Sequence, residues 1–592
     1  MRRRGRILGL TAAVTLAGCV SPPAAEPAAE PAAEPAAEPA PTPSPVGDWH
    51  GEIRAGERRV RSAIHIEEAA PGVFFGDIDM PDKGQWDAPL EEVALRDGVL
   101  TFALRGGTRR FEGRWDPAAA GWAGQFHNPR GAHPVVYQAG FLGMPVIDGL
   151  DGAWEGVVAM QGARRRFLLR ITTDAHGTRG LLDLPDRVET DLPVDPLTRQ
   201  GDAITFAVPA LGVRFDGAMD PEATSFTGTL TALGIAAPIA FTRSERGPRR
   251  RPQTPAPPFP YEVEEVSYAP AAGVRIHCTL TRPSGAGPRP AALLLSGTGP
   301  QDRDEALVGH KPFLVLADHL TRRGLAVLRC DDRGAGRSSG DHPRATLEDF
   351  AGDAAAGIDL LRARPDVVAA EIGLIGHSEG GLVAAMVARA RPEVAFVVLM
   401  AGPGVPIHEL LLQQGDALAR AEGVPEAVIA ERAPLRRAIL DAMRGAADPD
   451  AARAAVEALL RAEGAPPQVA RAQAELEVRP EILRIVGVDP GPILAGVSAP
   501  VLAILGSRDV QVPPAENLPA LRRALAGHAD AAVVELPGLN HLLQTAETGA
   551  LAEYYDLEET LAPRALETIT EWLAARGFGA REAVATGAEG GR

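Results

Sequence analysis

The second half of the chain alternates short apolar runs with longer amphipathic segments. Apolar runs of about four to eight residues are typical of strands that are buried on both faces. Strands that alternate with helical segments predict a mostly parallel sheet, so we expect an α/β domain over residues 261–577. The expected strands are Val274–Thr281, Ala291–Ser296, Leu325–Cys330, Ile372–Gly376, Ala395–Met400, Val501–Leu505 and Ala532–Leu536.

Between about residues 46 and 244 apolar and polar positions alternate one by one. Val99–Leu104 and Ala203–Val208 are examples, bounded by Gly, Asp and Pro. Such runs predict antiparallel strands with one face on a core. We therefore expect an all-β module ahead of the α/β domain.

The all-β module contains an internal repeat. Phe102 matches Phe206 at a separation of 104 positions, and several further aromatic and glycine positions repeat at the same spacing. This predicts two similar β units, which we place at residues 46–145 and 146–244. Matched positions hold no acid–base pair and no metal-ligand cluster. Two interpretations of the module stay open, a substrate- or envelope-binding module and a folding and spacing domain.

The chain begins with a segment typical of an export signal. Residues 1–6 are basic, and residues 7–17 are apolar but too few to span a membrane. Leu16-Ala17-Gly18-Cys19 resembles the bacterial lipobox, in which the cysteine becomes the lipid-bearing first residue. We therefore expect residues 1–19 to be a lipoprotein signal and Cys19 to be lipidated, which would hold an exported cell-envelope protein to a membrane. With Val20 next, the resemblance favours the outer membrane, facing the periplasm.

Three further segments are expected to lie outside the folded domains. Residues 20–45 repeat Pro-Ala-Ala-Glu four times and predict an extended tether. Residues 245–260 hold six prolines among several arginines and predict an exposed linker. Residues 578–592 predict a flexible tail.

Charge and cysteine content narrow the range of functions. The chain has 60 Lys and Arg against 77 Asp and Glu, a net charge of −17, so nothing suggests nucleic-acid binding. Besides Cys19 there are two cysteines, Cys278 and Cys330, both in strand-like runs. We expect these two to be small buried hydrophobic residues and not a disulfide. No metal or cofactor is implied.

One stretch combines a strand, a glycine-lined turn and a helix. An apolar run over residues 372–376 leads into Gly-His-Ser-Glu-Gly-Gly, where Ser378 is the serine, and residues 382–388 fit a packed helix. Glycines at such a turn omit the Cβ atoms that would clash where strand and helix meet. The serine is then exposed beside the first N–H groups of the helix. The pattern predicts that Ser378 is a nucleophile.

A second Gly-x-Ser-x-Gly match surrounds Ser338. It follows the polar loop 331–335 instead of a strand, and Pro343 soon after it disfavours an immediate helix. Ser338 is therefore expected to be a turn residue.

These motifs resemble the α/β-hydrolase superfamily over residues 261–577. The run Ser296-Gly297-Thr298-Gly299-Pro300-Gln301-Asp302-Arg303-Asp304, the run Asp331/Asp332-Arg333-Gly334 and the Gly-His-Ser-Glu-Gly-Gly turn are similar to bacterial esterases grouped with the serine-aminopeptidase-like branch. The resemblance implies a catalytic serine, followed along the chain by an acid and then by a histidine.

A serine hydroxyl needs a base, and the base needs an orienting carboxylate. His541 lies just past the last expected strand, where the histidine of the superfamily lies. Asp509 directly follows an apolar run, in a Gly-x-x-Asp-x-x-Val-Pro sequence that resembles the acid loop of the superfamily. His408 precedes the acid and His528 precedes the last strand, so both are wrongly placed. We expect a triad of Ser378, Asp509 and His541.

An acyl-transfer enzyme also stabilises an oxyanion. One donor should be the backbone N–H of Glu379, and the second should come from Thr298, with Gly297 as the alternative. The side chain of Glu379 should form an ion pair or face the pocket rim. Asp302–Asp304 should brace neighbouring loops through Arg333.

Residues 403–497 interrupt the expected fold with a segment rich in Ala, Arg, Leu and Glu. Leu410–Ala421 and Ala451–Glu463 fit helices. The superfamily inserts caps at this point, so we expect a helical cap that sets substrate choice.

The resulting hypothesis is a serine hydrolase that cleaves a small carboxylic ester through an acyl-enzyme. An aminopeptidase using the same triad is the alternative, and it would need lid carboxylates such as Glu409, Glu422 or Glu426 to bind the substrate amine. A non-catalytic envelope binding protein is disfavoured because all three triad positions are occupied.

Overall fold

The computed structural model describes residues 43–579, except for 57, 71, 84, 105–108, 129–130, 141, 161–162, 175–176, 233–234, 246–249 and 286. The expected signal with Cys19, nearly all of the tether and nearly all of the tail lie outside the described residues. In the part of the chain that is described, no helix has both the length and the apolar character needed to cross a membrane.

The first β unit closes into a barrel. Its strands follow one another around the barrel, and β1 pairs with β8 through Trp49 and Ala139. Aromatic and aliphatic side chains fill the interior. The strands are β1 (Gly47–Ala55), β2 (Arg58–Ala70), β3 (Val73–Met80), β4 (Gln85–Arg96), β5 (Val99–Leu104), β6 (Arg109–Asp116), β7 (Gly121–Asn128) and β8 (Gly131–Ala139), with a short helix η1 (Pro81–Lys83).

The second β unit is an antiparallel sheet with the strand order β12-β11-β10-β9-β17-β16-β15-β14-β13. Its strands are β9 (Gly152–Met160), β10 (Ala163–Asp174), β11 (Gly177–Leu184), β12 (Glu189–Val194), β13 (Leu197–Gln200), β14 (Ala203–Val208), β15 (Val213–Met219), β16 (Ser225–Ala232) and β17 (Ile235–Ser244), with η2 (Pro185–Arg187) and η3 (Pro209–Leu211). Both units are therefore all-β, as the alternating pattern predicts.

The two β units share one aromatic arrangement. Phe102 faces Phe111 across β5 and β6, with ring centroids 5.0 Å apart. Phe206 faces Phe215 across β14 and β15 in the same way, at 4.9 Å. These residues occupy matched positions of the sequence repeat, and in each unit they are part of the core.

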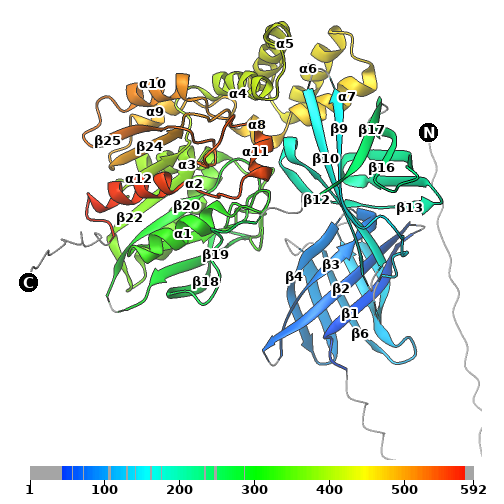
Figure 1. Cartoon of the computed structure of the whole chain (residues 1–592). Helices are drawn as coiled ribbons and strands as arrows, with labels where there is room; N and C mark the ends of the chain where they lie inside the picture. The colour runs from blue at the N-terminus through cyan, green and yellow to red at the C-terminus, as the bar shows by residue number, and fades with distance from the viewer. Residues whose placement is uncertain are drawn as a thin grey trace, which may run out of the picture. The chain divides into compact units, whose positions relative to one another are not determined.

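The C-terminal domain is built on a sheet with the order β18-β19-β21-β20-β22-β23-β24-β25 (Figure 1). The strands from β21 to β25 run parallel, while β18 and β19 are antiparallel at one edge. Each expected strand is present within a few residues, and β18 is additional. Their bounds are β18 (Tyr261–Ala271), β19 (Val274–Pro283), β20 (Arg289–Leu295), β21 (Ala326–Cys330), β22 (Val367–His377), β23 (Val397–Met400), β24 (Val501–Gly506) and β25 (Ala531–Leu536).

Helices cover both faces of this sheet (Figure 1). The apolar sides of α1 (Pro312–Arg322) and α12 (Pro563–Ala574) pack on one face. On the other face lie α2 (Leu347–Arg362), α3 (Glu379–Ala390) and α10 (Pro514–Ala524). This two-sided burial explains why the central strands read as continuous apolar runs.

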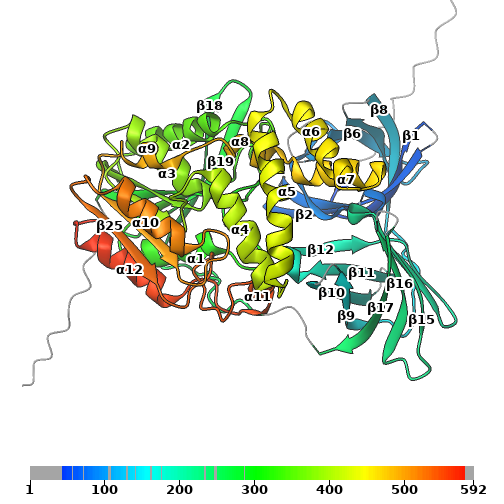
Figure 2. The same cartoon turned by 90° about the horizontal axis from the view of Figure 1, so that it is seen from above.

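Six helices lie between β23 and β24 in the described chain: α4 (Ile407–Ala421), α5 (Glu426–Gly445), α6 (Pro449–Ala462), α7 (Pro467–Glu477), α8 (Pro480–Ile485) and α9 (Pro490–Leu494). Helices α5, α6 and α7 have a small core of their own, which includes Ile439, Val456 and Ala470. In Figure 2, α4 and α5 lie side by side. The segment is helical, as the composition of residues 403–497 predicts.

The expectation for the two strand cysteines is wrong. Cys278 and Cys330 form a disulfide that joins β19 to β21. The two residues are direct partners in the antiparallel register, which places both sulfurs on one side of the sheet. A spacing of 52 residues along the chain gives no sign of this pairing.

Candidate active site

The turn between β22 and α3 holds Ser378 in a strained backbone conformation, with φ 52° and ψ −118°. A Cβ atom on Gly376 would lie 2.1 Å from the carbonyl oxygen of Gly380, and one on Gly380 would lie 2.1 Å from that of Leu295. Only glycine fits at these two positions. The turn therefore has the geometry of a nucleophile elbow.

Asp509 and His541 are joined by a hydrogen bond. His541 Nδ1 lies 2.8 Å from Asp509 Oδ2, and both side chains are buried. Asp509 Oδ1 accepts hydrogen bonds from the backbone N–H groups of Gln511 and Val512, at 2.8 and 2.7 Å. A carboxylate that is held in this way accepts the Nδ1 hydrogen of His541, so Nε2 is left able to take a proton.

Ser378 and His541 line the same cavity, which has a volume of about 460 Å³. Asp509 follows β24 and His541 follows β25, so the residues approach from successive strand ends. His408 and His528 are not among the described lining residues. The structure thus brings together the three positions expected for a triad. In the described part of the chain, no group of His, Cys, Asp and Glu side chains is placed to hold a metal ion.

The structure separates the two candidates for the second oxyanion donor. The backbone N–H of Gly297 donates to Glu305 Oε1 at 2.7 Å, so this donor is already engaged. Thr298 lines the cavity together with Glu379. Glu379 is the first residue of α3, where backbone N–H groups have no acceptor within the helix. The geometry therefore favours Thr298 over Gly297.

The carboxyl group of Asp332 anchors the loop that carries Thr298. Ser296 Oγ donates to Asp332 at 2.8 Å, and the backbone N–H of Gln301 donates to the same carboxyl group at 3.1 Å. Burial raises the pKa of Asp332 to about 8, although both hydrogen bonds oppose the rise. This anchor fixes the loop at its start and beyond Thr298.

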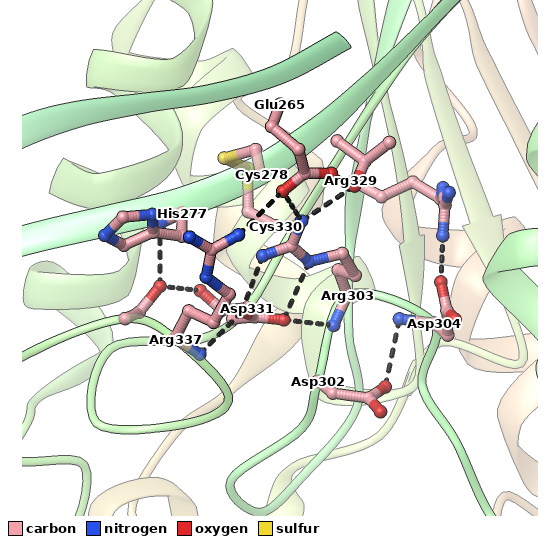
Figure 3. A network of polar contacts seen from close by, with 12 residues as sticks. Glu265, His277, Cys278, Asp302, Arg303, Asp304, Arg329, Cys330, Asp331 and Arg337 are labelled. Atoms are coloured by element: carbon pink, nitrogen blue, oxygen red, sulfur yellow. Dashed lines mark hydrogen bonds and ion pairs between the residues drawn. A yellow bond between two sulfur atoms is a disulfide. The ribbon is translucent and has the colours of Figure 1, made fainter. Parts of the chain in front are cut away.

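A charged network braces the outer side of the same loop (Figure 3). Arg303 forms ion pairs with Asp331 at 2.8 Å and with Glu265 at 2.6 Å. Asp304 pairs with the buried Arg329. Residues 302–304 therefore brace neighbouring elements, as expected.

The expected partner in that network is wrong. Arg333 does not reach residues 302–304 but pairs with Asp353 of α2, at 2.7 Å. Asp331, two residues earlier, is the group that binds Arg303. The side chains of Asp331 and Arg333 point in different directions although they are only two residues apart. The sequence does not tell which of the two meets Arg303.

Ser338 directly follows the turn residues Gly336 and Arg337, its backbone N–H donates to the carbonyl oxygen of Ala335 at 2.8 Å, and it is buried. Its Oγ donates to the carbonyl oxygen of Asp331 and accepts from the backbone N–H of His277, both at 2.8 Å. The hydroxyl is thus engaged twice with backbone, in agreement with the expectation of a turn residue.

The side chain of Glu379 forms an ion pair, one of the two outcomes that the sequence suggests. Its partner is Arg484 of α8, with Nε 3.3 Å from Oε1, and both side chains are buried. Burial raises the pKa of Glu379, and the charge of Arg484 opposes the rise. The guanidinium of Arg484 also lies 4.7 Å from the centroid of the Phe350 ring. One residue of the helical segment is thereby fixed against the nucleophile turn.

Aliphatic side chains from the helical segment form much of the cavity wall. Helix α4 and helix α8 both contribute to it. The residues are Ile407, Leu410, Leu411 and Leu418 from α4, and Ile482 and Ile485 from α8. The acidic lining residues are Glu305 and Glu379, whose oxygens bind His377 and Arg484.

The three lid carboxylates suggested for amine binding lie elsewhere. Glu422 pairs with Arg165 at 2.7 Å, and Glu426 pairs with Arg420 at 2.5 Å. Glu409 is half-exposed and lies beside His408. None of the three is among the described residues that line the cavity.

The second β unit supplies part of the cavity wall. Arg187 and Val188, at the end of η2, are among the lining residues. Next to them, Leu168 of β10 belongs to a buried apolar cluster with Leu542, the residue after His541. The sequence pattern assigns these residues only to a β unit.

Sequence reasoning also missed Glu305, His377 and Arg484 as parts of the site. Arg484 is one of many arginines in the helical segment, and Glu305 ends a charged run with no distinguishing mark. His377 is the first variable residue of the Gly-x-Ser-x-Gly pattern. Its position directly before the expected nucleophile was the sequence feature that could have pointed to it.

Comparison with known proteins agrees with this architecture. Residues 311–548 match the Hydrolase_4 family, described as serine aminopeptidase, S33. Esterase EstD of Thermotoga maritima is 27% identical over 297 residues, which cover 50% of this chain and 64% of that esterase. The chain thus spans less than two thirds of the length of this relative.

Two solved structures are similar to about half of the chain. Est1E from Butyrivibrio proteoclasticus with bound ferulic acid has 16% identity and a TM-score of 0.31, covering 51% of this chain and 97% of that one. Esterase Pf2001 from Pyrococcus furiosus has 15% identity and a TM-score of 0.35, covering 56% and 99%. The family match, the strand order and the nucleophile elbow together support an α/β-hydrolase fold for the C-terminal part of the chain.

Proposed function

We propose that this protein is a serine hydrolase that cleaves carboxylic esters through an acyl-enzyme, with Ser378, His541 and Asp509 as its triad. The observation that carries the proposal is the hydrogen bond from His541 Nδ1 to Asp509, with His541 and Ser378 on one cavity. This geometry leaves His541 Nε2 as the base that the serine requires.

In the proposed reaction Ser378 Oγ attacks the ester carbonyl carbon while His541 Nε2 takes the hydroxyl proton. The backbone N–H groups of Glu379 and Thr298 donate to the developing oxyanion. The C–O bond to the alcohol then breaks, and His541 returns its proton to the leaving oxygen. Water, deprotonated by His541, attacks the acyl-enzyme and releases the carboxylic acid and Ser378. Asp509 keeps its charge throughout and stabilises the imidazolium.

The lining of the cavity favours an ester with an apolar acyl group as substrate, in preference to an aminoacyl amide. Its wall is largely aliphatic where α4 and α8 line it. An aminopeptidase needs a carboxylate for the substrate ammonium. Of the two acidic residues that line the cavity, Glu305 binds His377, and Glu379 binds Arg484 through Oε1 while its Oε2 is buried without a hydrogen bond. The three lid carboxylates lie elsewhere. An ammonium group held against the aliphatic wall formed by α4 and α8 would be desolvated without a carboxylate partner.

The experiment compares kcat/KM on p-nitrophenyl esters of different acyl length with kcat/KM on aminoacyl p-nitroanilides. We expect the esters to be cleaved at least about 100-fold faster, equivalent to about 2.7 kcal/mol in the barrier. Faster cleavage of the anilides would contradict the ester assignment and favour the aminopeptidase.

We further propose roles for the segments around the catalytic domain. Helices α4–α9 act as a cap that selects the acyl group, and the two β units are products of a duplication. The described disulfide supports export, because disulfides persist in oxidising compartments. Lipidation of Cys19 and an outer-membrane location facing the periplasm complete this proposal. Mass spectrometry of the mature N-terminus tests it, since an unacylated protein starting elsewhere contradicts lipidation.

A further inference from the structure

His377, the residue before the nucleophile, is buried between two acceptors on opposite sides of its ring. Nδ1 lies 2.8 Å from Glu305 Oε1, and Nε2 lies 3.1 Å from the backbone carbonyl oxygen of His541. The side chains of His377 and Glu305 are 7% and 6% exposed, so water does not replace either partner. The rings of His377 and His541 have centroids 4.8 Å apart.

Counting hydrogens at these contacts fixes the proton on Nε2 of His377 and leaves two placements for the proton shared with Glu305. A backbone carbonyl oxygen can only accept, so His377 Nε2 carries a hydrogen. Glu305 Oε1 already accepts the backbone N–H of Gly297, and it accepts His377 Nδ1–H as well when it is a carboxylate. His377 is then an imidazolium paired with a carboxylate, whereas a protonated Glu305 would instead donate to Nδ1 of a neutral ring.

Electrostatics favours the charged pair. Burial alone lowers the pKa of His377, but the charge of Glu305, the two hydrogen bonds and the more distant charge of Asp509 outweigh burial and raise it. Glu305, Asp509 and the ring of His541 are titratable groups that face His377 from the packed elements. Asp332, whose pKa is raised by burial and also by the charge of Glu305, binds Ser296 and Gln301.

The backbone of Glu305 has a positive φ, as does that of Ser378. Glu305 has φ 52°, in the left-handed region where glycine or asparagine costs less. Non-glycine residues persist there when the surroundings over-determine them, and they cluster at functional sites. The one carboxylate oxygen of Glu305 contacts both the Gly297 loop and the residue before Ser378.

We propose that the Glu305–His377 ion pair is a positioning device that fixes the oxyanion loop and the base loop to the nucleophile turn. Glu305 orients Gly297 so that the next N–H, that of Thr298, faces the reacting carbonyl. His377 holds the backbone of His541 in line with Ser378. This inference rests on the proposed serine mechanism and adds two residues to it.

The oxyanion loop at Gly297 comes close to the side chains of Glu305 and His377, which explains why positioning depends on these two residues. A Cβ atom on Gly297 would lie 3.2 Å from Glu305 Oε1 and 3.4 Å from His377 Nδ1. The oxyanion loop is thus pressed against the ion pair, and a shift of either side chain moves the loop. Misplacement of about 1 Å at a reacting group costs about 100-fold in rate.

The kinetic test uses the full chain, one small p-nitrophenyl ester and the variants Glu305→Gln, His377→Asn and the double variant. Each single change should lower kcat by about 30-fold or more while KM changes by less than about threefold, because positioning acts on the reaction step. The double variant should be no slower than the slower single variant, since both changes break one unit. Glu305→Asp, which keeps the charge, should recover part of the rate.

A matched control and a second readout keep the outcomes separate. Glu426→Gln removes a surface ion pair outside the cavity and should leave kcat unchanged. Ring-nitrogen NMR at pH 8, assigned by the signals lost in His377→Asn, should show both nitrogens of His377 protonated, whereas an ordinary histidine with a pKa of about 6.5 is neutral. A neutral His377 ring, or a Glu305→Gln rate within threefold of the wild type, would overturn the proposal. If Ser378→Ala kept its activity, the serine mechanism would fail instead, while the NMR result would still report on the pair.

Discussion

Arg484 of α8 is buried against Glu379, the residue that follows Ser378, with Nε 3.3 Å from Oε1. The contact ties the helical segment to the first turn of α3 through a pair of opposite charges. Arg484 also donates to the carbonyl oxygen of Ala345 at 3.2 Å. A substitution at Arg484 should therefore lower the stability of the protein and also shift the backbone N–H of Glu379.

Replacing Arg484 by Met should destabilise the protein by about 3–5 kcal/mol near neutral pH, because it leaves an unpaired buried carboxylate. Burial already raises the pKa of Glu379, and loss of Arg484 raises it further. A carboxyl group with a raised folded-state pKa contributes its stability below the unfolded pKa and loses it as pH rises through the folded pKa. The destabilisation should thus be larger at pH 8 than at pH 5 in urea unfolding, and equal losses would contradict this account. Adding Glu379→Gln should restore much of the stability.

The disulfide should contribute about 4 kcal/mol by closing a 52-residue loop. The double variant Cys278→Ala/Cys330→Ala should melt at a lower temperature than the oxidised wild type. Reductant should lower the melting temperature of the wild type and leave that of the variant unchanged. A wild type that is insensitive to reductant under conditions that reduce the bond would contradict this prediction.

Only part of the disulfide could be predicted from the sequence. The strand positions of both cysteines were predictable, because the apolar runs that contain them are long and buried. Their pairing depends on β19 and β21 being neighbours in one register, which no local pattern contains.

The candidate site likewise contains residues that could be predicted from the sequence and residues that could not. Ser378, Asp509 and His541 could be predicted because each follows a strand in an order that the superfamily resemblance fixes. Glu305 and Arg484 come from a loop and a helix whose sequences carry no such mark. Only the folded chain brings their side chains to Gly297 and Glu379. The cavity wall at Val188 could not be foreseen either, since it comes from another domain.

Val188→Gly tests that contribution of the second β unit. Val188 has φ 57°, which suits glycine, so the change should not destabilise the backbone. It removes one apolar wall group, and kcat/KM for a long-chain ester should fall about 5- to 10-fold, about 1–1.4 kcal/mol, while an acetate ester is unaffected. Ala223→Gly, at φ 54° in the connection between β15 and β16 and not among the described cavity-lining residues, is the matched control. Equal effects on both esters would show that Val188 does not contribute to selection of the acyl chain.

Asp509→Asn should lower kcat by about 1,000-fold or more, because an amide at this position can donate and so stabilises the wrong tautomer of His541. KM should change little, since Asp509 is buried beneath His541 and is not among the described cavity-lining residues. The measurement is steady-state hydrolysis of a p-nitrophenyl ester, with circular dichroism to show that the variant is folded. A loss below about tenfold would remove Asp509 from the triad.

The central claim is that Ser378 carries the acyl group. Its most direct test is labelling with a fluorophosphonate, followed by peptide mass spectrometry, on the wild type, Ser378→Ala and Ser338→Ala. We predict that the wild type and Ser338→Ala are labelled on the peptide that contains Ser378, that Ser378→Ala takes up no label, and that ester hydrolysis follows the same pattern. Labelling or turnover retained by Ser378→Ala would contradict the account.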